Sequence, residues 1–534
     1  MRLLPSLLVT LALAACHPGA PASDGSKDPA RSPKSTEPAI DLVELDITEA
    51  QRRMAAGTLT SEDLTRAYLA RIAAIDDAGP KLGAVIELDP KALRYAALLD
   101  RHRTEGNVRG PLHGIPVLIK DNIDVAGMVN SAGSLAMANN RPERDALLVK
   151  RLRGAGAVIL GKTNLSEWAN LRSMKSVSGW SSRGGQTRNP YVLDHNPCGS
   201  SSGTGTAIAA SLAMVGVGTE TDGSILCPAA VAGLVGLKPT VGLVSRTGII
   251  PISVTQDTAG PMARTVTDAA ILLAAMVGDD IHDPLTTNAP QHTDYLTGLR
   301  QGALAGKRIG VLRQAMGYSP AVDAVTERAI ASLRAAGAVI VDPADITTWD
   351  QWAAPELEVL LFEFKAGLDA YLARSGGAVH SLAELIAWND AHAREVMPLF
   401  GQELLIQAQA RGGLDSPEYL KARAAARRLA WDDGLLATLE RHRLDALVAP
   451  TVGPAWPTDP MPGEHLGGAG YGAAAVAGTP SLTVPMGDDR GLPLGLVFLG
   501  RPFAEAQLLA FGHAFEQITR ARRPPEYRRT LAAR

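Results

Sequence analysis

The sequence predicts an α/β protein with a mixed β-sheet and a helical insertion. Short apolar runs of the kind found in buried strands alternate with helical periodicity between residues 84 and 518. From 355 to 439 the periodicity is helical and strand signals are scarce, which indicates an insertion at about 353–440. Of the 534 residues, 46% are hydrophobic and 4% aromatic, which suits one large core of small aliphatic side chains. We expect residues 40–534 to form a single domain.

The first elements after residue 40 are typical of a scaffold. Residues 48–51 fit a capping box that opens a helix ending near Gly57, and a second helix is expected at 61–72. A strand over 84–88 and a helix over 92–102 follow.

A lysine ends the next predicted strand. Residues 117–119 form an apolar run typical of a buried strand, and Lys120 follows it directly. Such a lysine either extends to the surface or is desolvated, and desolvation lowers its pKa toward the range of a base. The serine-rich loops downstream favour the desolvated lysine.

Two loops rich in serine and glycine flank an apolar run at 207–217, which is long enough for a buried helix or for a helix and a strand. The first is Gly199-Ser200-Ser201-Ser202-Gly203 and the second is Thr221-Asp222-Gly223-Ser224. Glycines permit tightly turned backbone, so N–H groups can point into a cavity beside a serine. This combination indicates acyl transfer, which needs an activated nucleophile and donors for the oxyanion.

The C-terminal half continues the alternation of strands and helices. A helix is expected at 266–276, and residues 307–341 are typical of a β-α-β unit. After the helical insertion we expect strands at 446–451, 481–485 and 494–499 and a final helix at about 504–518.

Residues 1–15 have the pattern of a signal peptide. Arg2 precedes an apolar run that is too short to span a bilayer, for which about 20 residues are needed. Its end resembles a bacterial lipobox with Cys16 as the lipidated residue, and an ordinary secretory signal with a chance cysteine is the alternative. Residues 16–39, rich in Pro, Ser and Gly, are expected to be a flexible tether. The prediction is a lipid-anchored protein of the bacterial cell envelope, facing the periplasm, with the outer membrane favoured.

Charge and motifs argue against several other classes. With 52 basic and 55 acidic residues the net charge is −3, which gives no electrostatic case for a nucleic-acid partner. There is no His-Glu-x-x-His motif, and no metal or cofactor is expected. Gly216-Val217-Gly218 lacks the third glycine of a dinucleotide fingerprint. We expect a monomer that binds a small-molecule or peptide amide.

Taken in order, the motifs resemble the amidase signature family of serine hydrolases. Residues 114–116 with Lys120-Asp121 match its Gly-Ile-Pro to Lys-Asp motif, Gly199-Ser200-Ser201 its Gly-Ser-Ser motif, and 222–225 its nucleophile motif. The resemblance continues through 236–240 and 257–262 and covers nearly all of residues 40–520.

The resemblance implies the amidase signature fold, in which helices cover both faces of a large mixed β-sheet, and a Ser-cisSer-Lys triad. Ser224 is then the nucleophile, Ser200 the relay and Lys120 the base. The implied oxyanion hole consists of backbone N–H groups of Thr221, Asp222, Gly223 and Ser224. The supporting or substrate-binding candidates are Gly199, Ser201, Ser202, Glu220 and Asp257.

Residues 178–186, 218–225 and 362–365 look most like the bacterial peptide amidase branch of that family, which removes C-terminal amides of peptides and releases ammonia. This chain has Asp222, Glu220 and Leu226 where the family often has glycine, aspartate and arginine. A general aliphatic or aryl amidase of the same family is the alternative.

Other hypotheses remain for comparison. An esterase with Ser201 as nucleophile would use the Gly-x-Ser-x-Gly motif, but the residues before it are polar and broken by proline where a strand is needed. A glutaminase subunit that passes ammonia to a tRNA-modifying partner and a non-catalytic envelope protein are further alternatives. Cys198 and Cys227 can pair in an oxidising compartment, but two free buried thiols are the favoured state.

Overall fold

The computed structural model describes residues 40–290, 294–460, 464 and 467–531, and the described residues from Asp41 onward form one compact unit. The predicted signal peptide at 1–15, Cys16 and the tether at 16–39 lie outside the described residues. None of the helices in the described ranges has the length and apolar character needed to cross a bilayer.

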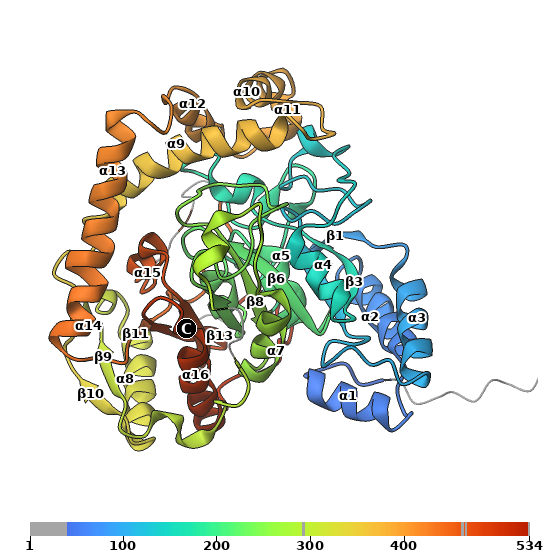
Figure 1. The fold of residues 1–534 in the computed structure, drawn as a ribbon, viewed down its shortest axis with the longest axis horizontal. Coiled ribbons are helices and arrows are strands. Elements are labelled where there is room, and N and C mark those ends of the chain that lie inside the picture. The colour runs from blue at the N-terminus through green and yellow to red at the C-terminus, as the bar shows by residue number, and fades with distance from the viewer. Residues whose placement is uncertain (1–39, 291–293, 461–463, 465–466, 532–534) are drawn as a thin grey trace, which may run out of the picture. The chain divides into compact units, whose positions relative to one another are not determined.

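A mixed sheet of 11 strands forms the centre of the described unit, in the order β1-β3-β2-β6-β8-β7-β12-β13-β11-β9-β10 (Figure 1). Parallel pairs join β2 to β3 and β6, and β9 to β10 and β11, whereas the remaining neighbours are antiparallel. The strands are β1 Val85–Leu88, β2 Pro116–Lys120, β3 Val158–Thr163, β6 Val215–Glu220, β7 Val235–Lys238, β8 Thr258–Ala263, β9 Arg308–Val311, β10 Val339–Val341, β11 Ala446–Pro450, β12 Ser481–Asp489 and β13 Leu492–Leu499. A separate hairpin joins β4 Trp180–Ser181 to β5 Gly185–Gln186.

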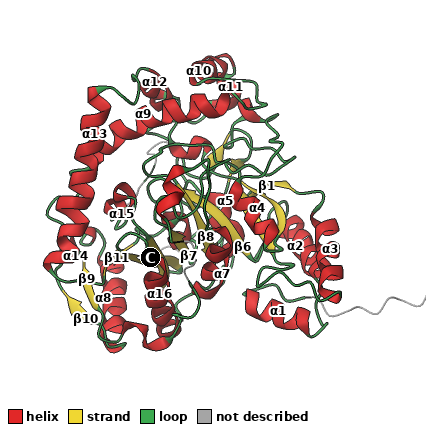
Figure 2. Cartoon of the chain, in the orientation of Figure 1, coloured by secondary structure: helices red, strands yellow, loops and turns green. Residues whose placement is uncertain are grey.

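Helices cover both faces of the sheet, as predicted (Figure 2). On one face α16 packs against α7 and α8, and α5 packs with α6 over β6, β7 and β13. The helices outside the insertion are α1 Ile47–Ala55, α2 Ser61–Ile75, α3 Ala92–Thr104, α4 Leu147–Gly154, α5 Ser202–Ala209, α6 Leu226–Val231, α7 Val266–Met276, α8 Pro320–Ala335, α15 Gly472–Ala477 and α16 Glu505–Thr519.

The apolar runs chosen from the sequence become buried central elements. Every residue of β2 is buried, because β2 has a parallel neighbour on each side and helices cover its faces. The run at 207–217 contains the end of α5 and the start of β6, so the helix-and-strand alternative is the correct one. The β-α-β unit is also confirmed, since β9 and β10 are parallel and α8 connects them.

The insertion predicted at about 353–440 consists mainly of helices. These are α9 Ala353–Leu372, α10 Leu382–Ala391, α11 Ala393–Val396, α12 Glu403–Gln409, α13 Pro417–Arg427 and α14 Ala437–Arg441. Leu361, Phe364 and Leu368 of α9 pack in a cluster that includes Met137 and Trp168 of the preceding loops. The insertion is thereby held against the loops that follow β2 and β3.

The capping box predicted at 48–51 is misplaced by two residues. Helix α1 begins at Ile47, and the N-cap is Asp46, whose carboxylate accepts from Glu49 N. Aspartate is as good an N-cap as threonine, so Asp46 can cap the helix in place of Thr48. The backbone N–H of Ile47, the first helical residue, donates to the carboxylate of Asp268.

Close packing of α5 against the backbone at Ala84 and Asn164 depends on a small residue and generates a stability prediction. A Cβ at Gly203 would lie 2.4 Å from the carbonyl oxygens of both Ala84 and Asn164. Gly203→Ala is therefore expected to lower the free energy of unfolding by about 1–3 kcal/mol, as overpacking does. The measurement is urea unfolding, with Gly302→Ala as the control because a Cβ there meets nothing within 4 Å. Equal losses in the two variants would contradict this explanation.

Candidate active site

The side chain of Lys120 lies at the buried end of β2 and contacts two hydroxyl groups. Its Nζ is 2.7 Å from Ser200 Oγ, 2.8 Å from Thr219 Oγ1 and 3.2 Å from the Thr219 carbonyl oxygen. The side chain is fully buried, and this desolvation lowers the pKa of Lys120 to about 7, against the opposing fields of Glu220 and Asp257. The amine is therefore partly neutral near neutral pH.

Thr219 reaches Lys120 because β6 is the parallel neighbour of β2. Asn122 donates from Nδ2 to Thr219 Oγ1 over 3.0 Å, so one acceptor position of that hydroxyl is already used. The amine is thus surrounded by a fixed set of oxygen atoms in a dry environment.

Ser200 and Ser224 come from different loops and line the same cleft. The loops are joined by a hydrogen bond from Ser201 N to the Ser224 carbonyl oxygen over 3.1 Å. The cleft is narrow, and Thr219, Thr221 and Asp257 contribute to its polar lining. Ile249, Ile250 and Ile252 supply an apolar wall. An amine and two serine hydroxyls therefore meet at one cleft.

The carboxylate of Glu220 stabilises the turn that carries Ser224 by accepting backbone hydrogen bonds. Its Oε2 accepts from Ile225 N over 2.7 Å and from Leu226 N over 2.9 Å. Gly223 has φ +75°, and a Cβ there would lie 2.4 Å from the ring of Tyr471, so glycine is needed both for the backbone conformation and for the close approach. Glu220 supports the turn and, at 1% exposure, does not line the cleft.

The N–H groups of this turn have different surroundings. The backbone N–H of Gly223 interacts with the carboxylate of Glu220 and stabilises its charged form. Asp222 N–H and Ser224 N–H donate to no other group in the described residues. Free N–H groups beside a serine hydroxyl can receive a developing oxyanion.

The remaining candidates from the sequence lie around these loops. Ser201 is fully buried, donates to the Thr219 carbonyl over 3.0 Å and does not line the cleft. Ser202 donates to the Cys198 carbonyl over 2.6 Å, and the Gly199–Ser200 peptide bond is cis. Asp257 accepts from Thr221 Oγ1 over 2.6 Å and from Ile252 N over 2.7 Å. These residues shape the loops.

Cys198 and Cys227 form a disulfide, so the prediction of two free thiols is wrong. Their Cα atoms lie 6.0 Å apart although they are separated by 29 positions in the sequence. The hydrogen bond between Ser201 and Ser224 brings the two loops together, and that proximity could not be read from the spacing. The cross-link joins the residue before Gly199-Ser200 to the helix that follows Ser224.

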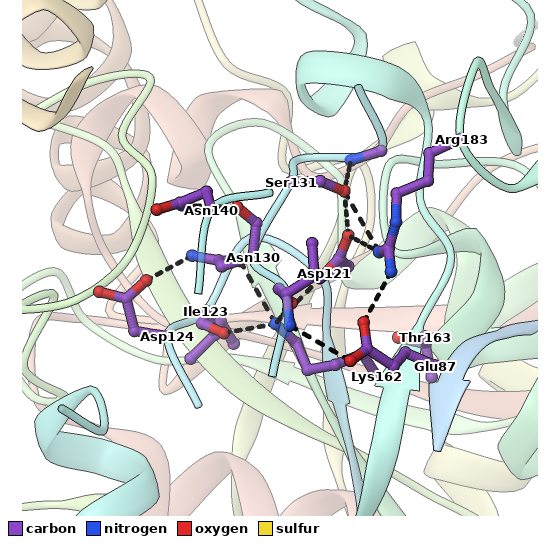
Figure 3. A network of polar contacts seen from close by, with 12 residues as sticks. Glu87, Asp121, Ile123, Asp124, Asn130, Ser131, Asn140, Lys162, Thr163 and Arg183 are labelled. Atoms are coloured by element: carbon purple, nitrogen blue, oxygen red, sulfur yellow. Dashed lines mark hydrogen bonds and ion pairs between the residues drawn. The ribbon is translucent and has the colours of Figure 1, made fainter. Parts of the chain in front are cut away.

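A second buried lysine lies next to the site, and the sequence reasoning missed it. Lys162, in β3, forms an ion pair of 3.1 Å with Asp121 and donates to the Ile123 carbonyl over 2.7 Å (Figure 3). Arg183 also binds Asp121, at 3.0 Å, and reaches Glu87 on β1 at 2.6 Å. This network holds the chain directly after Lys120. The signal was present, because Lys162 follows an apolar run just as Lys120 does.

Thr219 and Asn122 are the other residues that the sequence reasoning missed. Thr219 lies within 218–225 and Asn122 directly follows Lys120-Asp121, but Thr219 becomes a partner of Lys120 only through the pairing of β2 with β6.

The chain is similar to known proteins over most of its length. A model of the amidase family matches residues 63–509. The chain is 40% identical over 490 residues to a probable amidase of Arabidopsis thaliana, which covers 88% of this chain and 89% of that protein. A solved complex of the peptide amidase PAM with the competitive inhibitor chymostatin is 57% identical, with a TM-score of 0.89 over 90% of this chain and 99% of that chain. The native peptide amidase of Stenotrophomonas maltophilia is 56% identical, with a TM-score of 0.88 over 91% and 99%.

These comparisons overturn the predicted location. Relatives in a plant and in two fungi match most of this chain. Such organisms have no bacterial envelope, and the shared sequence and fold need no anchoring in one. The prediction of a lipid-anchored protein in the bacterial cell envelope is therefore wrong by this comparison, and the lipid anchor has no support.

The disulfide generates a stability prediction. Replacing both Cys198 and Cys227 by serine removes a cross-link between residues 29 positions apart, and we expect a loss of about 3 kcal/mol in the free energy of unfolding. Urea unfolding measures the loss, and the control is the same measurement with a reductant. The reductant should lower the stability of the parent protein to that of the double variant and leave the double variant unchanged. A parent protein that is no more stable than the double variant would refute the prediction.

Proposed function

This chain belongs to the amidase family, enzymes that hydrolyse amide carbon–nitrogen bonds, and we propose that it removes C-terminal amides of peptides through Ser224, Ser200 and Lys120. The observation that carries the proposal is the contact of 2.7 Å between Lys120 Nζ and Ser200 Oγ in the cleft that Ser224 also lines. Amide hydrolysis needs a nucleophile, a base and oxyanion donors, and each has a candidate here.

The proton path begins at a neutral Lys120. A neutral amine has two N–H groups and one lone pair, whereas the three contacts of Nζ include a carbonyl oxygen that can only accept. One contact must therefore run from a hydroxyl to the amine. With Ser200 as that donor, its proton moves to Lys120 while Ser200 Oγ takes the proton of Ser224.

The chemistry at Ser224 then proceeds through an acyl-enzyme. Ser224 Oγ attacks the amide carbon, and the oxyanion is stabilised by N–H groups of the turn at 221–224, each worth roughly 3–4 kcal/mol in related sites. The proton held by Lys120 returns through Ser200 to the amide nitrogen as the carbon–nitrogen bond breaks, and ammonia leaves. Water enters, gives a proton along the same path and releases the carboxylic acid.

The peptide substrate is supported by the similarity to peptide amidases. Identity of 56–57% extends over 90–91% of this chain, far above the 40% of the plant relative. A panel of peptide amides, aliphatic and aryl amides and glutamine, scored by the release of ammonia or amine, tests the substrate class. Faster turnover of peptide amides is expected, and a preference for small amides would assign a general amidase activity instead.

The role of Ser224 generates a prediction about activity. Ser224→Ala is expected to lower kcat by about 10⁴-fold or more, because the nucleophile is lost. Its melting temperature should change little, because Ser224 Oγ makes no hydrogen bond within the described residues. A serine-directed covalent probe should label the parent protein and Ser201→Ala but not Ser224→Ala. Labelling at Ser201 would favour the esterase alternative.

The buried amine generates a prediction about pH. Burial lowers the pKa of Lys120 to about 7, and the neutral form is the base, so log(kcat/KM) should rise with unit slope below pH 7 and level off above it. Lys120→Met should abolish this rise together with the activity. A profile that stays flat between about pH 5 and about pH 9 would exclude Lys120 as the base, because a lysine base with a pKa anywhere from about 7 to the ordinary value near 10.4 makes the rate rise within that range.

A further inference from the structure

Carboxyl groups gather beside Ser224 without basic partners at contact distance. Asp222 precedes Ser224 by two residues, and Glu356 lies in the first turn of α9. In the described ranges neither forms an ion pair, and the cation whose field reaches Asp222 is the buried Lys238. The fields of Glu356 and Glu220 both oppose the charge of Asp222. The local electrostatics therefore favour a positive ligand.

Asp222 is accessible to solvent, and we call its surroundings with Glu356 and Tyr471 the recess. Its side chain is exposed, yet so much protein surrounds it that desolvation, followed by the fields of Glu356 and Glu220, raises the pKa of Asp222 well above its usual range. The carboxyl is accessible although protein surrounds it, so a ligand group can reach it.

Glu356 is coupled to the turn of the nucleophile through Gln256. Gln256 Nε2 donates to Glu356 Oε1 over 2.8 Å and to the Thr221 carbonyl over 3.4 Å. Glu356 is 7% exposed, and its other oxygen has no hydrogen-bond partner in the described part of the chain. Desolvation raises the pKa of Glu356 to about 7. One carboxylate oxygen is thus fixed while the other is available.

Tyr471 provides a second, independent observation at the same place. Its side chain is 5% exposed and packs on Gly223, where a Cβ would lie 2.5 Å from Tyr471 Oη. Within the described ranges the hydroxyl has no hydrogen-bond partner. It lies in the fields of Asp222, Glu220, Glu356 and Glu464. The side chain is almost fully buried while the hydroxyl itself remains accessible, so a ligand group can bind it.

We propose that this recess binds a cationic group on the acyl part of the amide substrate, with Asp222 and Glu356 as its carboxylate partners and the Tyr471 hydroxyl as a further acceptor. The inference rests on the proposed function of Ser224. A cation between these carboxyls removes their mutual repulsion and compensates for their desolvation, which a neutral group cannot do.

The position of Asp222 in the chain indicates which part of the substrate carries the cation. Two residues span at most about 7 Å of backbone, so Asp222 is near the acyl carbon that Ser224 attacks. The leaving group of a primary amide is ammonia and carries no further group to recognise. The cation therefore belongs to the acyl part, as a basic side chain or as a free α-ammonium. A guanidinium, with five N–H donors, matches several acceptors at once.

The test compares amides that differ in charge but not in shape. Nα-acetyl-argininamide is matched with Nα-acetyl-citrullinamide, and Nα-acetyl-lysinamide with Nα-acetyl-norleucinamide. We expect kcat/KM to be about tenfold or more higher for each charged member, as for a charge-assisted hydrogen bond away from bulk water. Free norleucinamide against its acetylated form tests the α-ammonium as the source of the charge. A ratio near one in all three pairs would overturn the inference.

Variants of Glu356 and Asp222 test whether these carboxyl groups cause the preference for charged substrates. Glu356→Gln keeps the shape of the side chain, and it should reduce the ratio for the arginine and citrulline pair about tenfold or more. Asp222→Asn should do the same. The matched control is Glu358→Gln, two positions along α9, because Glu358 pairs with Arg411 at 2.7 Å. Its ratio should equal that of the parent protein, and a ratio lowered equally by Glu358→Gln would refute the assignment to Glu356.

The outcomes separate this inference from the proposed function. If no amide is hydrolysed, or if Ser224→Ala retains full activity, the function of the site is wrong. If Ser224→Ala is inactive and charged and neutral amides are hydrolysed equally well, the triad stands and the cation site is refuted.

Discussion

The burial of the Lys120 amine against hydroxyl groups is the constraint on which the site depends. An amine in water is protonated at neutral pH, but in a dry environment its charged form loses hydration that three oxygen contacts only partly replace. The surrounding structure maintains that balance. β2 lies inside the sheet between two parallel neighbours, and the loop after Lys120 is held by the Asp121 and Lys162 ion pair. Water cannot reach the amine without the opening of this core.

The meeting of the two serine loops depends on small residues and close backbone approach. Gly203 lets α5 contact the carbonyl groups of the neighbouring loops, and Gly223 lets the turn of the nucleophile contact Tyr471. The disulfide and the hydrogen bond from Ser201 to Ser224 join the two loops directly. A dense interior of small side chains therefore holds the serine hydroxyls rigidly, which a catalytic arrangement requires.

Charge is distributed unevenly about Ser224. The buried Lys120 approaches neutrality, whereas Asp222 and Glu356 are carboxyl groups that form no ion pair in the described residues. Both features have the same physical origin, since desolvation penalises any charge that lacks a partner. In the first case the penalty produces a base. In the second case the penalty leaves two carboxyl groups whose charge a cationic substrate can stabilise.

The sequence by itself determined the α/β class, most element positions and the residues that meet at the cleft. Those features depend on local periodicity and on residue spacing, as in the run before Lys120 and the glycines around Ser200 and Ser224. Only the tertiary structure decided the disulfide, the partnership of Thr219 with Lys120, the network of Lys162 and the approach of Glu356 and Tyr471 to the nucleophile. These contacts join residues far apart in the chain through the pairing of β2 with β6 and the packing of α9. No local pattern encodes such pairings, because their geometry arises from the whole folded core.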